Sequence, residues 1–136
     1  STLAVTLFPY TTLFRSETKY ELGWLLFRDK SGSRIAEAVQ HLKAAIDGGV
    51  EVPQARLYYG LALLGLNRFS EATAEFTAFC KQTPAGVQTM LQYADRSLRT
   101  EQPDAARVFL NVVLAVDPEA RERYPQLAEM LRRVGL

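Results

Sequence analysis

Between residues 34 and 116, apolar residues recur every three or four positions, which is the spacing of one face of an α-helix. Short polar stretches with glycine or proline interrupt this pattern, so it predicts a series of separate helices. We expect the main helices at Arg34–Asp47, Pro53–Leu66, Ser70–Gln82, Val87–Thr100 and Pro103–Val116. Glu17–Asp29 has a similar wide apolar face, and the tail has one at Pro125–Arg133, with Leu127, Ala128, Leu131 and Val134. The pattern therefore predicts an all-α fold.

Local signals indicate where these helices begin and end. Ser33 is available as an N-cap, and Pro53 suits the first helical turn, where its missing amide donor costs nothing. Gly48 and Gly49 follow the first of the main helices as a typical stop. Asn67-Arg68 is predicted to form a tight turn, and Pro84 cannot continue a helix.

A repeat underlies the pattern. Residues 87–120 repeat the pattern of residues 53–86 at a fixed offset, so that Tyr59 corresponds to Tyr93. The other matched pairs are Gly60 and Ala94, Leu64 and Leu98, Ala72 and Ala106, Phe76 and Leu110, Phe79 and Val113, and Pro84 and Pro118. A period of about 34 residues is typical of helix–turn–helix units that stack into a solenoid.

These positions resemble the tetratricopeptide repeat (TPR) family, whose units carry a small residue, an alanine, a large apolar residue and a proline in fixed order. Two complete sets are Gly60, Ala72, Phe76 and Pro84, then Ala94, Ala106, Leu110 and Pro118. An earlier unit has Gly23, Ala38 and Leu42, with Val50 in place of proline. The resemblance implies an αα-superhelix of three repeats (about 17–52, 53–86 and 87–120) and a C-terminal capping helix (about 121–136). Large side chains at the small positions would overpack the helix pairs, at a cost of about 1–3 kcal/mol.

Residues 1–16 do not fit this pattern. A β-hairpin with strands at Thr6–Phe8 and Thr12–Phe14 is one interpretation, and a signal peptide is poorly supported because a positively charged start is missing. Thr6–Ser16 is instead similar, residue for residue, to the translation of a common sequencing-library adapter, with a variable barcode at Leu3–Val5. We therefore expect residues 1–16 to be non-native, without a fold, and the natural protein to begin upstream of Glu17, so that the chain is a truncated fragment.

Composition and charge exclude several classes of function. Lys plus Arg number 16 against 15 for Asp plus Glu, so no basic footprint for nucleic acid or an anionic membrane is expected. One cysteine, Cys80, excludes an internal disulfide and is expected to be a buried apolar residue. One histidine, His41, is expected to face solvent and leaves too few ligands for a zinc site. No catalytic motif is found, so we expect neither an enzyme nor a cofactor or metal.

The concave face of a TPR array is lined by the first helix of each unit. Carried over, the resemblance implies a partner-binding groove of Tyr20, Trp24, Phe27, Arg28, Leu57, Leu61, Leu64, Leu91, Asp95, Leu98 and Arg99. The Lys and Asn residues that bind a C-terminal carboxylate in some members are missing, and an apolar groove suits an amphipathic helix or an extended peptide. Trp24 could equally pack against a lost preceding helix, and Asp95 with Arg99 could be a solvated ion pair.

We therefore expect a non-catalytic scaffold that binds a peptide or helix of an unidentified protein, in which Trp24→Ala and Leu61→Ala weaken binding. One alternative is a C-terminal regulatory or substrate-recruiting segment of a larger bacterial signalling or transferase enzyme. Another is an arm that holds a homo-oligomer together. The sequence assigns no compartment, and a cytoplasmic location is the default expectation.

Overall fold

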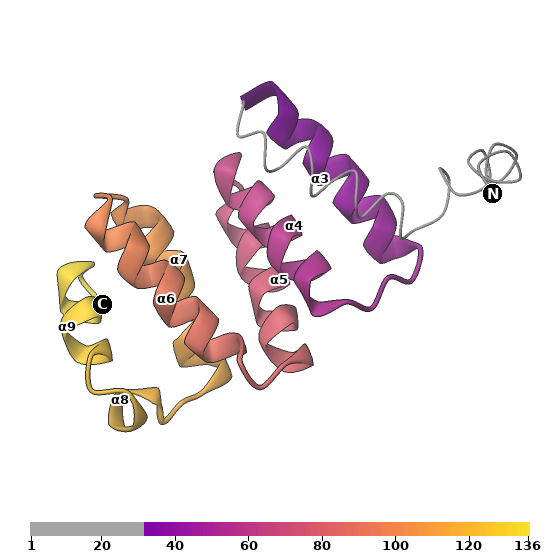
Figure 1. Cartoon of the computed structure of the whole chain (residues 1–136). Coiled ribbons are helices and arrows are strands. Elements are labelled where there is room, and N and C mark those ends of the chain that lie inside the picture. Colours follow the sequence, from indigo (N-terminus) through magenta and orange to yellow (C-terminus); the bar gives the residue numbers. More distant parts are fainter. Residues whose placement is uncertain (1–31) are drawn as a thin grey trace, which may run out of the picture. The chain divides into compact units, whose positions relative to one another are not determined.

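The computed structural model describes residues 32–136, and within them the chain is helical, with no strand (Figure 1). The helices are α3 (Gly32–Asp47), α4 (Pro53–Gly65), α5 (Phe69–Gln82), α6 (Gly86–Arg99), α7 (Pro103–Val116), α8 (Ala120–Arg123) and α9 (Leu127–Arg133). The all-α prediction is thus confirmed for the described part of the chain. The bounds of the five main helices agree with the sequence to within a turn of helix or better, and those of α7 agree at both ends.

The chain divides into two compact units, Ser1–Asn67 and Arg68–Leu136, which we describe separately. In the first, α3 and α4 pack against each other. Their buried apolar residues are Ala38, Val39, Leu42 and Ala45 on α3, and Ala55, Leu57, Tyr59, Ala62 and Leu63 on α4. At Gly65 the two helices are so close that an added Cβ would lie 3.3 Å from Cδ1 of Ile35. The predicted repeat 53–86 has one helix in each unit, and the packing of that helix pair stays a prediction.

In the second unit, α5 packs beside α7 and α6 packs beside α9, while α6 and α7 contact each other extensively (Figure 1). Phe109 of α7 lies in the core of this unit. Its ring centroid is 5.0 Å from that of Phe76 on α5 and 5.4 Å from that of Tyr93 on α6. The close approach of α5 to α6 depends on Gly86, because a Cβ there would lie 2.5 Å from Cα of Cys80.

The helix ends confirm several of the local signals and correct one. Gly49 has a φ of +100° and Asn67 has a φ of 61°. This is the left-handed conformation that a helix stop and a tight turn require. Pro53 occupies the first turn of α4. Ser33 is not an N-cap, because α3 begins at Gly32 and places Ser33 inside the helix.

The tail differs from the single helix predicted at Pro125–Arg133. It forms two short helices, α8 and α9, and Pro125 lies in the break between them, where its ring and missing N–H oppose helix continuation. Leu127, Leu131 and Val134 are buried as predicted, but Ala128 is exposed and Met130 is buried instead. The short α9 is held by Arg107 of α7, whose Nε and Nη2 donate to the carbonyl oxygen of Val134 at 3.2 and 2.8 Å.

Candidate partner-binding surface

The structure separates the predicted groove residues into three groups. Tyr20, Trp24, Phe27 and Arg28 lie outside the described residues. Leu57, Leu91 and Leu98 are buried, with relative exposures of 8, 4 and 7 %, whereas Leu61 and Leu64 are half-buried. Asp95 and Arg99 are exposed and form an ion pair of 2.8 Å along α6, which matches the solvated-pair interpretation. The partner-binding role of all these residues stays a prediction.

A groove of about 470 Å³ lies between α6 and α9 in the second unit. Its lining residues come from both sides: Gln88, Leu91, Gln92 and Asp95 from α6, and Gln126, Glu129, Met130 and Arg133 from α9 and the residue before it. Leu91 and Asp95 had been predicted here from the repeat positions. The α9 side had not, although the apolar face of the predicted capping helix was a usable signal.

Three amide and three charged side chains line the walls of this α6/α9 groove. Gln88 and Gln92 are exposed and lie one helical turn apart on α6, and Gln126 lies across from them. The floor is apolar and narrow, because Leu91 and Met130 are 4 and 7 % exposed. The groove can therefore offer hydrogen-bond donors and acceptors along its length and a small apolar contact at its base.

The charged groups of the groove are Asp95, Glu129 and Arg133, and the first two are ion-paired within their own helices. Asp95 is paired with Arg99, and Glu129 is paired with Arg132. Both pairs are exposed to solvent, so each contributes little to stability or to a net field. The groove therefore offers its three amides and the exposed guanidinium of Arg133 for recognition.

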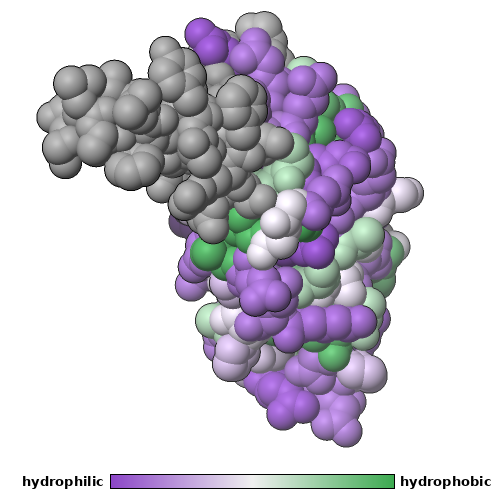
Figure 2. All heavy atoms as spheres, turned by 90° about the vertical axis from the view of Figure 1, so that its right-hand side faces the viewer, coloured by the Kyte–Doolittle hydropathy of each residue, from purple (hydrophilic) through white to green (hydrophobic). Residues whose placement is uncertain are grey.

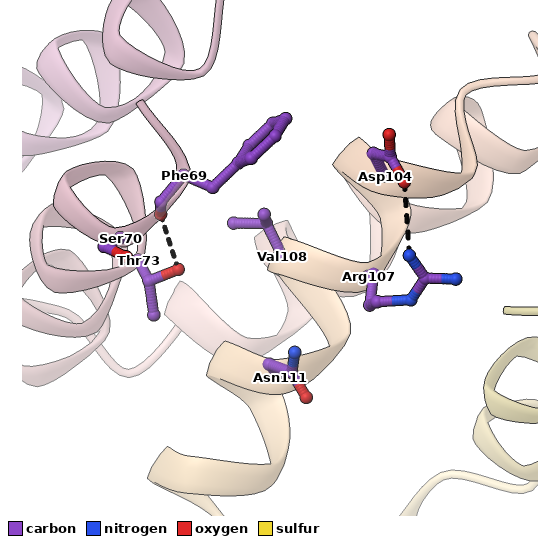
Figure 3. A pocket seen from close by; sticks show the side chains of 7 residues that line it. All are labelled: Phe69, Ser70, Thr73, Asp104, Arg107, Val108 and Asn111. Carbon is purple, nitrogen blue, oxygen red and sulfur yellow. Dashed lines mark hydrogen bonds and ion pairs between the residues drawn. The ribbon is translucent and has the colours of Figure 1, made fainter. Parts of the chain in front are cut away.

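A second hollow, of about 330 Å³, lies between α5 and α7 (Figure 3). Its lining residues are Phe69, Ser70 and Thr73 of α5, and Asp104, Arg107, Val108 and Asn111 of α7. Phe69 and Val108 point into the space between the helices. The Thr73 hydroxyl donates to the carbonyl oxygen of Phe69 at 2.8 Å, and Nη1 of Arg107 donates to Asp104 at 3.1 Å. The repeat positions did not predict this α5/α7 hollow.

Residues 32–136 contain few other side chains that could bind a metal or react. His41, which we expected at the surface, is half-buried on α3. Cys80 is buried as predicted, and its burial raises the pKa of the thiol to about 11. Within residues 32–136, no three His, Cys, Asp or Glu side chains gather in a way that could hold a metal ion. None of the helices described has both the length and the apolar character of a membrane span.

The surface of the described residues is mostly polar on the face drawn in Figure 2, where apolar residues form small separate areas. In residues 34–136, the large apolar side chains that are exposed are Val52, Phe69 and Leu136.

Compared with models of known protein families, with curated proteins and with solved structures, the chain matches none of them. The TPR family therefore stays a prediction, made from the repeat in the sequence and from the helix pattern.

Proposed function

We propose that the chain is a TPR-type helical solenoid that acts as a non-catalytic scaffold and binds an extended peptide segment of a partner protein in the α6/α9 groove. The fixed offset between the repeats supports the solenoid, because several of the repeated positions share their burial. Ala72 and Ala106 are both 0 % exposed, and so is Ala38 at the corresponding place in the first predicted repeat. Small residues at these positions allow close helix packing.

The amide-lined walls of the groove carry the proposal of an extended peptide. A helix satisfies most backbone N–H and C=O groups internally, so it presents few of them to Gln88, Gln92 and Gln126. An extended segment presents both kinds of group in alternation, and each glutamine can donate to one and accept from the other. The shallow floor of Leu91 and Met130 suits one small or medium apolar side chain of that segment. This revises the amphipathic helix that the apolar sequence positions equally allowed.

The proposal can be tested with a library of unstructured peptides displayed against the whole chain. A selected peptide is then resynthesised with single N-methyl groups at successive backbone amides. If the glutamines recognise the backbone, N-methylation at the contacted amides weakens binding about tenfold each, whereas side-chain replacement at the same positions has small effects. Isothermal calorimetry measures both series.

The matched variants are Gln92→Ala in the groove and Gln82→Ala at the end of α5. Both residues are exposed glutamines on helices, so the two variants change helix propensity alike. We expect Gln92→Ala to weaken peptide binding and Gln82→Ala to leave the affinity unchanged. Equal affinities for the two variants, or a selected peptide that binds only when helical, would contradict the proposal.

A further inference from the structure

The charged side chains on the two helices of the α6/α9 groove are paired differently. Asp95 and Arg99 lie four residues apart on α6 and form an ion pair of 2.8 Å. Glu129 and Arg133 have the same spacing on α9, but Glu129 is paired with Arg132 instead. Within the described part of the chain, the Arg133 guanidinium has no hydrogen bond or ion pair. Arg133 therefore lines the groove as an exposed cation whose N–H donors are open to a ligand.

The position of Arg133 matches the spacing of side chains on an extended peptide. Arg133 follows Met130 by three residues on α9, so their Cβ atoms are neighbours on one helix face, about 5–6 Å apart. Both residues line the groove. Side chains two residues apart on an extended segment project from the same face and are about 6.4–6.8 Å apart. A peptide whose apolar side chain contacts Met130 thus places the second residue before or after it beside Arg133.

We propose that the groove selects peptides with an acidic side chain two residues from the apolar residue that contacts Met130, and that Arg133 binds its carboxylate. The proposal rests on peptide binding in the α6/α9 groove and names the class of peptide that binds there. A guanidinium offers a carboxylate two parallel N–H donors, so this contact fixes the orientation of the peptide as well as adding affinity. Because Arg133 neighbours Met130, which contacts a side chain of the peptide, the carboxylate belongs to a side chain rather than to a C-terminus.

The pairing of the other charges favours an acidic peptide over a basic one. Both carboxylates that line the groove already have an arginine partner, so a basic residue of the peptide would have to displace Arg99 or Arg132. An acidic residue meets Arg133 without such a displacement. The contact is exposed to solvent, so salt screens it and limits its contribution. We therefore expect the loss of either charge to weaken binding about threefold to fivefold, which is less than the effect of each backbone contact.

Peptides selected from a library of unstructured sequences against the whole chain are the probe. We expect aspartate or glutamate to be enriched two residues from an apolar residue that the selected peptides share. Replacing that acidic residue by its amide should weaken binding about threefold to fivefold in calorimetry, with a smaller effect at high salt. Amidation of the peptide C-terminus should leave the affinity unchanged. An effect of this amidation alone would overturn the proposal, because the carboxylate would then belong to the C-terminus.

Arg133→Gln in α9 and Arg121→Gln in α8 are the matched variants, because both remove an exposed arginine but only Arg133 lines the groove. We expect Arg133→Gln to weaken binding of the acidic peptide about threefold to fivefold and Arg121→Gln to leave it unchanged. The amide-substituted peptide should bind Arg133→Gln as tightly as it binds the unmodified chain, because the two changes remove the same contact. Circular dichroism establishes that each variant is folded.

The variants also separate this proposal from the proposed function. If Gln92→Ala weakens binding of a selected peptide but Arg133→Gln does not, the acidic contact is overturned and the peptide groove stands. Additive effects of Arg133→Gln and the amide substitution would overturn the acidic contact as well. Selected peptides whose binding depends on neither Gln92 nor Arg133 would overturn the peptide groove, and the acidic contact with it.

Discussion

The contact between Gly86 and Cys80 allows a sharp test of how the second unit is packed. Gly86 is the first residue of α6 and is buried against the end of α5. In Gly86→Ala, the new Cβ would lie 2.5 Å from Cα, 3.0 Å from Cβ and 3.0 Å from Sγ of Cys80. Carbon atoms pack favourably at about 3.5–4.0 Å, so the start of α6 must move away from α5 by about 1 Å.

The energetic cost of Gly86→Ala depends on which atom the new Cβ contacts. Overpacking costs about 1–3 kcal/mol, and we expect the upper part of this range because the nearest atom belongs to the backbone and cannot rotate away. Alanine recovers up to about 1 kcal/mol of helix propensity. The free energy of unfolding should therefore fall by about 2 kcal/mol, which lowers the melting temperature by about 6–10 °C for a chain of this size.

Thermal and urea unfolding followed by circular dichroism measure this change. Gly65→Ala is the first control, because its Cβ meets only the flexible end of Ile35, at 3.3 Å. Its effect on the free energy of unfolding should stay within about 0.5 kcal/mol. Gly49→Ala is the second control, since its Cβ meets no atom within 4 Å but the residue must adopt a φ of +100°. That left-handed conformation costs alanine about 1–2 kcal/mol.

A double variant separates backbone from side-chain overlap. Cys80→Ala removes Sγ and leaves Cα in place, so Cys80→Ala/Gly86→Ala should recover little of the lost stability. Full recovery in the double variant would mean that the sulfur alone opposes the alanine. A Gly86→Ala protein as stable as the unmodified chain would refute the close approach of α5 and α6.

Three further predictions concern single side chains. Arg107→Met keeps the apolar stem but removes two hydrogen bonds to the Val134 carbonyl, so amide exchange of Leu136 and its neighbours should accelerate about tenfold, measured by NMR. Cys80, whose pKa is raised to about 11 by burial, should react with a disulfide reagent at about pH 8 far more slowly in the folded chain than in guanidinium, and equal rates would contradict its burial. The hydrogen bond from Arg123, helped by the Glu119 amide, lowers the pKa of Asp117. Asp117 therefore stabilises the fold above its unfolded pKa of about 3.9 and loses this effect as pH falls through the lower folded value. Urea unfolding should show Asp117→Asn to be less stable than the unmodified chain at about pH 7, with the difference shrinking toward about pH 2.

Features that depend on a few adjacent residues could be predicted from the sequence. Pro103 and Asp117-Pro118 bracket α7, and the predicted bounds of that helix were correct at both ends. The last predicted helix, Pro125–Arg133, corresponds to α9, whereas α8 was missed because its four residues, Ala120–Arg123, are too few to show an apolar spacing. Gly86 carries no local signal for its contact with Cys80, since that contact depends on how two helices meet in space.

The candidate sites were harder to predict because the type of a residue does not determine whether its side chain is exposed. Leu91 and Leu98 were assigned to the groove as apolar contacts, yet both are buried, and the glutamines beside Leu91 form the accessible walls. The groove positions implied by the TPR resemblance cover only the first helix of each unit, so they could not indicate a hollow between α5 and α7, which are second helices.

The repeat itself indicates where specificity lies. Several matched positions that carry apolar residues are buried in both copies, as Phe76 and Leu110 are, since each fills the same space in the packing. Some matched positions that differ in type reach the surface: Leu61 is half-buried where Asp95 is exposed. Phe69 corresponds in the same way to Pro103, and both are exposed. Packing constrains the first class in every unit, whereas the second class is free to vary from unit to unit. The proposed α6/α9 groove draws its distinguishing side chains from exposed positions, which is where a repeated scaffold can acquire a particular partner.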